Sequence, residues 1–180
     1  MEKNNPINRT VSLEQLVGRL KREDSNYAQL SRIMQMMYWI FIPVFLIMAY
    51  RHFTDSGDYL LLIGDGCKIL AILIFALFFG KYYREYKYVD YAVPTLTMLK
   101  NAAYRYKPFH GRMLWIVLAV GLLDAGLYTT GFGSSNFLLS QVLFIGSILL
   151  AILAGLLLWY IKYKPLRDDA LRLIEDIEGN

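Results

Sequence analysis

Four long apolar stretches constrain the fold of this chain more than any other feature. A helix needs about 20 mostly apolar residues, at about 1.5 Å per residue, to cross the hydrocarbon core of a bilayer. The stretches that reach this length are residues 33–52, 58–81, 112–132 and 136–162. The composition, 56% hydrophobic and 15% aromatic over 180 residues, is also too apolar for an ordinary soluble domain. The sequence therefore predicts an all-α membrane protein with four transmembrane helices.

The distribution of basic residues predicts how these helices are oriented. Of the 19 Lys and Arg residues, 17 lie within residues 1–32, 81–112 and 162–180. Because Lys and Arg accumulate on the cytoplasmic side of membrane proteins, we expect these three segments to be cytoplasmic. We then expect the helices to pair as two hairpins, with both termini in the cytoplasm.

The same patterns divide the chain into five segments. We expect a cytoplasmic amphipathic helix in 1–32, a transmembrane hairpin in 33–81, a cytoplasmic Tyr-rich and basic loop with a short helix in 82–111, a second hairpin in 112–162, and a cytoplasmic amphipathic tail in 163–180. Ser12 followed by Gln15 is typical of a helix N-terminus. Pro43 in the first span predicts a kink.

Three charged residues interrupt the apolar stretches. Lys68 lies about 14 Å and Asp124 about 12 Å from the expected outer surface by helical rise, and Asp65 is one turn from Lys68. Since a charge at the bilayer centre costs about 2.5–3.5 kcal/mol, such groups normally pair inside a bundle. The sequence predicts a buried cluster of Asp65, Lys68 and Asp124. This cluster is either a static lock between helices or a proton- or ion-responsive site.

Small and polar residues near these charges are further candidates. The glycines that flank the two acids favour close approach of the second and third spans; they are Gly64, Gly66, Gly121 and Gly126. Gln141 and Ser147 in the fourth span are expected to form hydrogen bonds between helices.

The amphipathic segments predict a surface for lipid or for a partner. Apolar stripes include Leu16, Leu20 and Leu99, and cations accompany them in the middle loop. The cations expected on this surface are Arg84, Lys87, Arg105 and Lys107. Two partners fit such a surface: anionic lipid headgroups and a cytoplasmic regulatory protein. A homo-oligomer is also compatible with the composition.

Several function classes find no support in the sequence. The single Cys67 excludes an intrachain disulfide, and His52 and His110 are expected at opposite membrane faces, where they are solvated and share no metal. The chain has no catalytic motif, so we expect neither an enzyme nor a cofactor. The basic segments show no helix-turn-helix, zinc or RNP-type pattern, so we expect no nucleic-acid partner.

The segment VDYAVPTLTMLKNAAYRYKPF, preceded by LEQLVGRLKRED and followed by a hairpin, resembles small four-span bacterial inner-membrane proteins often found beside extracytoplasmic-function sigma factors. The resemblance implies a regulatory, anti-sigma-like role at the membrane. The sequence thus favours an interaction or regulatory protein with a basic cytoplasmic surface. The alternative is an oligomeric proton- or ion-responsive transporter or channel that uses the buried acid and lysine residues.

Overall fold

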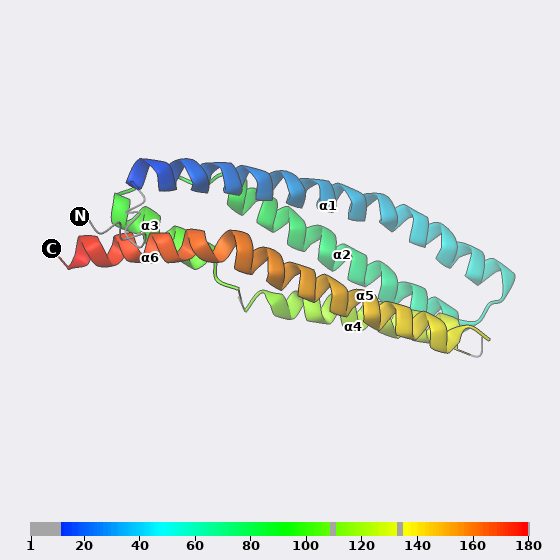
Figure 1. Ribbon diagram of the computed structural model, residues 1–180. Helices are drawn as coiled ribbons and strands as arrows, with labels where there is room; N and C mark the ends of the chain where they lie inside the picture. Colours follow the sequence, from blue (N-terminus) through cyan, green and yellow to red (C-terminus); the bar gives the residue numbers. More distant parts are fainter. Residues whose placement is uncertain (1–11, 109–110, 133–134, 180) are drawn as a thin grey trace.

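The computed structural model describes residues 12–108, 111–132 and 135–179 (Figure 1). Within these ranges the chain is helical and has no strand, which confirms the predicted all-α class. The elements are α1 (Leu13–Asp55), α2 (Tyr59–Lys87), α3 (Thr95–Arg105), α4 (Met113–Gly131), α5 (Phe137–Leu158), the π-helix η1 (Trp159–Tyr163) and α6 (Lys164–Glu178). Residues 1–11, which are part of the predicted cytoplasmic amphipathic helix, lie outside the described residues. His110 also lies outside them.

Four helical segments are long and apolar enough to cross a membrane, as the hydropathy pattern predicts. They are Leu13–Asp55, Tyr59–Lys87, Met113–Gly131 and Phe137–Glu178. The last of these combines α5, η1 and α6 into one continuous rod. Two of the segments are therefore much longer than a bilayer requires, and they extend beyond its expected thickness.

The helices form an elongated bundle (Figure 1). Along the bundle α1 packs on α2, α2 packs on α4, and α5 lies beside α4. We call the end that holds α3, α6 and the start of α1 the terminal end. We call the opposite end, where residues 56–58 connect α1 to α2, the turn end.

The first helix is a single element from the terminal end to the turn end. Ser12 caps it, because its hydroxyl accepts a hydrogen bond from the Gln15 amide at 3.3 Å. The helix continues through Pro43 without interruption. The predicted amphipathic helix and first span are thus one helix of 43 residues, about 64 Å long.

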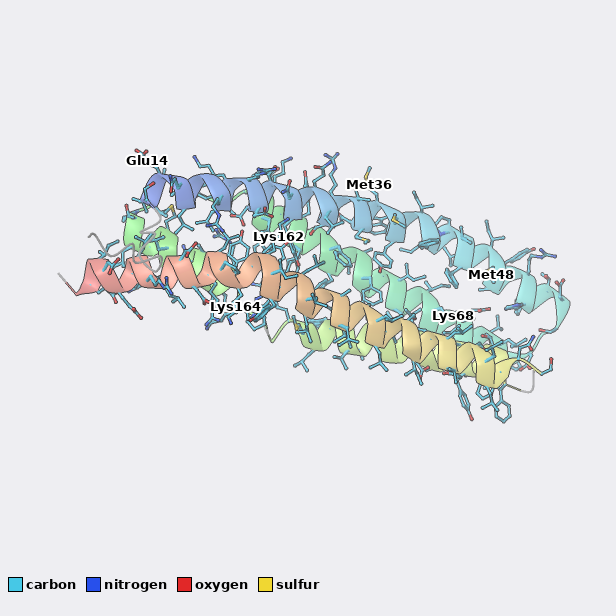
Figure 2. All side chains as sticks on the ribbon, in the orientation of Figure 1. Glu14, Met36, Met48, Lys68, Lys162 and Lys164 are labelled. Carbon is cyan, nitrogen blue, oxygen red and sulfur yellow. The ribbon has the colours of Figure 1, made fainter. Side chains whose placement is uncertain are left out.

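The second rod changes its winding where α5 becomes α6. Residues Trp159–Tyr163 form a single π-helical segment, and Pro165 follows at the start of α6. Pro165 has no amide hydrogen, so its nitrogen donates no backbone hydrogen bond at this junction. In Figure 2 Lys162 and Lys164 mark this transition, and the Lys162 ammonium lies 2.7 Å from the Glu23 carboxylate of α1.

A compact core lies at the terminal end and consists of the first half of α1, α3 and α6, which together we call the terminal bundle. Its buried residues are Leu16, Leu20, Met98, Leu99, Ala102, Ala103, Tyr106, Leu166, Ala170 and Ile174. The amphipathic stripes of three separate segments therefore pack against one another. An ion pair of 3.0 Å between Arg19 and Asp169 also joins α1 to α6.

The middle of the bundle has a different character. Large apolar side chains point outward along the spans; Ile40 is 64% exposed, Val117 67% and Leu150 69%. No residue of α5 is buried. Soluble proteins rarely expose so much contiguous apolar surface, whereas a lipid-facing helix does so by necessity.

Candidate functional site

Two of the predicted charged residues pair with each other inside the bundle. Asp65 and Lys68 lie one turn apart on α2, and the Lys68 ammonium is 3.2 Å from Oδ1 of Asp65. Asp65 is fully buried and Lys68 is 6% exposed. Because both charged groups are removed from solvent, each is stabilised by its contact with the other.

A histidine from another helix completes the site. His52 lies near the end of α1, and its Nδ1 is 2.6 Å from Oδ2 of Asp65. The two Asp65 oxygens therefore hold partners from α1 and α2. The sequence interpretation expected His52 to be solvated, and its side chain is 35% exposed, but the helix pairing also turns its ring toward Asp65, which the interpretation did not anticipate. The short connection of residues 56–58 was the available signal, since it brings the end of α1 level with the start of α2.

The third helix of the site is α4. The Lys68 ammonium donates a 2.9 Å hydrogen bond to the Thr130 hydroxyl, which donates in turn to the Gly126 carbonyl at 2.8 Å. Threonine hydroxyls commonly bond to the carbonyl one turn earlier in membrane helices, so Thr130 gave no distinctive signal in the sequence. We call the set His52, Asp65, Lys68 and Thr130 the polar network. It connects α1, α2 and α4.

Asp124 does not join the polar network. It is half-buried on α4, and within the described part of the chain its Oδ1 has no hydrogen-bond partner and its carboxylate forms no ion pair. Gly126 and Thr130 are one turn apart and face α2, whereas Asp124 is two residues from Gly126, about 200° around the helix. The expected cluster therefore contains Asp65 and Lys68 but not Asp124. The sequence-based estimate considered only the position of Asp124 along the helix axis and not its direction around that axis.

Close approach of α2 and α4 depends on two of the four candidate glycines. A Cβ atom at Gly126 would lie 2.6 Å from the Gly64 carbonyl oxygen, and one at Gly64 would collide with the Thr129 hydroxyl. At Gly66 and Gly121 a Cβ atom would meet nothing within 4 Å. Gly64 and Gly126 thus bring the two backbones together where Lys68 reaches Thr130.

A second buried carboxylate lies in the terminal bundle, and the sequence interpretation did not single it out. Asp24 of α1 is 2% exposed. It accepts hydrogen bonds from the Tyr91 hydroxyl at 2.5 Å, the Tyr106 hydroxyl at 2.6 Å and the Arg105 guanidinium at 3.0 Å. Burial, together with the neighbouring Asp24 charge, raises the pKa of both tyrosines above 10.0. Asp24 thereby fixes α3 and the segment before it onto α1.

The residues expected on a lipid or partner surface divide into two groups. Leu16, Leu20 and Leu99 are fully buried in the terminal bundle, so they do not form an accessible surface as expected. The physical reason is that three amphipathic segments within one chain satisfy one another. Arg105 is also withdrawn, because it pairs with Asp24.

Three of the predicted surface cations remain accessible. Arg84, Lys87 and Lys107 are exposed. The Lys87 ammonium lies 5.2 Å from the Tyr83 ring centre, and the Lys107 ammonium lies 5.2 Å from that of Tyr104. The two lysine ammonium groups therefore lie over aromatic rings, and all three cations remain exposed.

The polar candidates of α5 form no bond to another helix. Ser147 is exposed, and its hydroxyl donates to the Phe144 carbonyl of its own helix at 2.7 Å. Gln141 is half-buried and has no hydrogen bond to any residue that the structure describes. Metal binding finds no support in the described residues either, since no group of three His, Cys, Asp or Glu side chains converges there.

Comparison of the chain with protein-family models, with curated proteins and with solved structures finds no match. Its function must therefore be argued from the geometry of its own residues.

Proposed function

We propose that the chain is an integral regulatory protein of the bacterial inner membrane that responds to protons at the polar network. The four apolar rods span the bilayer, and the terminal bundle lies in the cytoplasm with both termini, as the distribution of Lys and Arg favours. Partners then meet the surface formed by the terminal bundle and the exposed cations Arg84, Lys87 and Lys107. An anti-sigma-like role, which the sequence resemblance implies, is one form of such regulation.

The observation that carries the proposal is the contact between His52 and Asp65 across two helices. Histidine is the side chain whose charge ordinarily changes between pH 5 and 8. The Asp65 carboxylate accepts a charge-assisted hydrogen bond from either form of His52, and protonation of His52 adds a direct attraction between opposite charges on α1 and α2. The charged group that faces this pair from α2 is Lys68, and α4 contributes the uncharged Thr130. Acidification at the turn end therefore tightens α1 against α2.

The continuity of α1 supports transmission to the cytoplasmic end. His52 and Asp24 belong to one unbroken helix and lie 28 residues apart, about 42 Å along the axis. Each of them contacts a buried polar cluster that includes other helices. A change in how α1 seats on α2 at one end thus reaches the contacts of Asp24 at the other end.

The test measures helix separation and terminal-bundle opening at two pH values. Spin labels at Tyr50 and Ile63, both well exposed, report the distance between α1 and α2 in a Cys67→Ser background. In lipid nanodiscs the distance distribution should narrow from pH 8 to pH 5. Hydrogen exchange in α3, corrected for its intrinsic pH dependence, should slow in parallel.

A matched pair of variants decides the result. His52→Gln should abolish both pH responses, because the amide holds no ionisable proton. Asp55→Asn removes an exposed acid from the same end of α1 and should leave both responses intact. A wild-type protein whose distance is the same at both pH values would exclude the proposal. Persistence of the response in the His52 variant would also exclude it.

A second candidate function is an oligomeric proton- or ion-coupled transporter or channel. Asp124 favours it, because its buried Oδ1 lacks a partner within the described residues and so offers a free acceptor on α4. Flux assays in proteoliposomes distinguish the two candidates. A transporter should lose flux when Asp124 becomes Asn, whereas a regulatory protein should show no flux at any pH and retain its pH response.

A further inference from the structure

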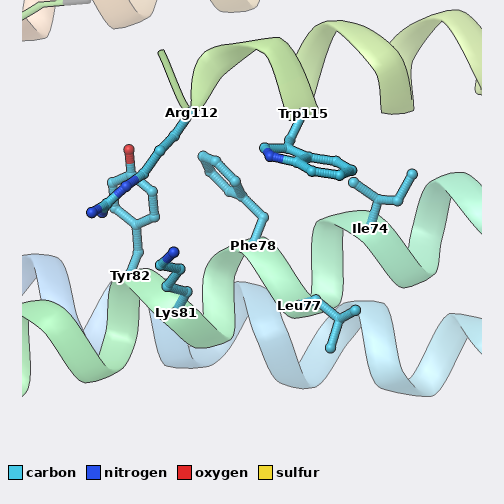
Figure 3. Close-up of a pocket in the computed structure, with 7 residues that line it drawn as sticks. All are labelled: Ile74, Leu77, Phe78, Lys81, Tyr82, Arg112 and Trp115. Carbon is cyan, nitrogen blue, oxygen red and sulfur yellow. The ribbon is translucent and has the colours of Figure 1, made fainter. Parts of the chain in front are cut away.

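A groove between α2 and α4 lies apart from both polar clusters (Figure 3). It has a volume of about 330 Å³ and opens to the surroundings. The residues that line it include Ile74, Phe78, Lys81, Tyr82, Arg112 and Trp115. In Figure 3 Phe78 and Trp115 face each other across the two helices, and Arg112 lies beside Tyr82.

The groove has an apolar part and a cationic part. Ile74 and the rings of Phe78 and Trp115 form the first, within the apolar stretches of α2 and α4. Lys81 and Arg112 form the second, where the apolar stretch of α2 ends and that of α4 begins. This division follows the change from acyl chain to headgroup in a bilayer, where aromatic and basic side chains gather.

The two cations have donors that the protein does not use. Lys81 is exposed, and its ammonium forms no ion pair or hydrogen bond with any described residue. Arg112 pairs through Nη1 with Glu85, and a guanidinium has five N–H donors, so several remain. An anion held between them would gain charge-assisted hydrogen bonds from both helices.

We propose that this groove binds one anionic phospholipid, with its phosphate between Lys81 and Arg112 and the start of an acyl chain against Phe78 and Trp115. Basic pockets between transmembrane helices on the cytoplasmic side are typical sites for anionic headgroups. The groove is too small for a whole lipid, so the remaining acyl chain lies along the exposed apolar face of α4, where Leu114 is 73% exposed. The bound lipid contacts α2 near its end and α4 near its start, and so joins the two helices.

The experiment is native mass spectrometry of the full chain in detergent, titrated with phosphatidylglycerol or phosphatidylcholine. The first phosphatidylglycerol should bind more tightly than phosphatidylcholine. Lys81→Gln should weaken phosphatidylglycerol binding about fivefold, the factor expected for one cation near the headgroup layer, and leave phosphatidylcholine unchanged. Lys21→Gln removes an equal charge from an exposed position on α1 that does not line the groove, and its effect should stay below about twofold.

The location of the lipid is tested with a photoactivatable phosphatidylglycerol that carries its reactive group near the headgroup. Adducts should map to residues 74–82 or 112–115. Equal affinity for the two lipids would overturn the proposal, as would equal effects of the two lysine variants. Displacement by inorganic phosphate alone would show a free-anion site and overturn the lipid assignment. Crosslinks from Trp115 to a second copy of the chain would show that protein, and not lipid, covers the groove.

Discussion

Removal of one hydroxyl group from the terminal bundle tests whether Asp24 holds the bundle together. The Tyr106 hydroxyl donates a 2.6 Å hydrogen bond to Asp24, and both residues are almost fully buried. Tyr106→Phe keeps the ring and its packing but deletes this bond. A hydrogen bond to a charged group contributes about 1.5–3 kcal/mol. Asp24 keeps two other donors, so the bundle should still form but open more often.

Opening is measured as chemical modification of a buried thiol. Ala170 of α6 is fully buried in the same core, so Ala170→Cys in a Cys67→Ser background reacts with a maleimide only when the bundle opens. The reporter substitution is present in every protein compared, so its own cost cancels. The expected loss of stability corresponds to a labelling rate about 10- to 150-fold higher in Tyr106→Phe.

Tyr88→Phe is the matched control, because Tyr88 is 71% exposed and its contact with the Lys87 ammonium involves the ring. It should label at the parent rate. An unchanged rate in Tyr106→Phe would refute the role given to Asp24, since a buried charge-assisted bond cannot be lost without cost. Equal acceleration by both variants would show that the rate reports general loosening.

The remaining predictions concern the polar network, the helix contact and the pH range of stability. Lys68→Met should lower the free energy of unfolding by about 3–5 kcal/mol in a detergent titration, because it leaves the Asp65 carboxylate buried without its cation. Adding Asp65→Asn should recover most of this loss, and equal stability of the single and double variants would contradict the pairing. Gly126→Ala should cost about 1–3 kcal/mol by the same measurement, since its Cβ would lie 2.6 Å from a backbone oxygen of α2, whereas Gly121→Ala, with open space around it, should be neutral. The raised pKa of Tyr106 means that the unfolded chain loses this proton first as pH rises above 10, so the contribution of Tyr106 to stability should be constant near neutral pH and fall above pH 10 by up to about 1.4 kcal/mol per pH unit. The free energy of unfolding should fall less steeply with pH in Tyr106→Phe. An identical slope would exclude the burial assigned to the Tyr106 hydroxyl.

Much of the fold follows from properties that vary along the chain in one dimension. The length of each apolar stretch determines whether a helix can span a bilayer, so four candidate spans were predictable from residue order alone. The presence of Asp65 and Lys68 one turn apart within such a stretch also predicted that they would pair. Ser12 as the N-cap of the first helix is a local signal of the same kind.

The partners across helices depend on rotation about each helix axis and on register between helices. Two residues correspond to about 200° of rotation, so Gly126 faces α2 while Asp124 faces elsewhere at nearly the same depth. The register of α1 against α2 selected His52 as the partner of Asp65. Hydropathy contains neither quantity, because it scores residues without regard to direction.

The amphipathic segments of the terminal bundle were predictable from residue order, whereas the surfaces that they bury were not. Residue order determined that three segments would be amphipathic, since the apolar side chains recur at helical spacing. It did not determine what their apolar faces would meet: lipid, a partner or one another. The tertiary structure decided this by bringing α1, α3 and α6 to one end, where Leu16, Leu20 and Leu99 exclude water together. The physical reason is that burial of apolar surface is non-directional, so the nearest complementary face in the same chain satisfies it.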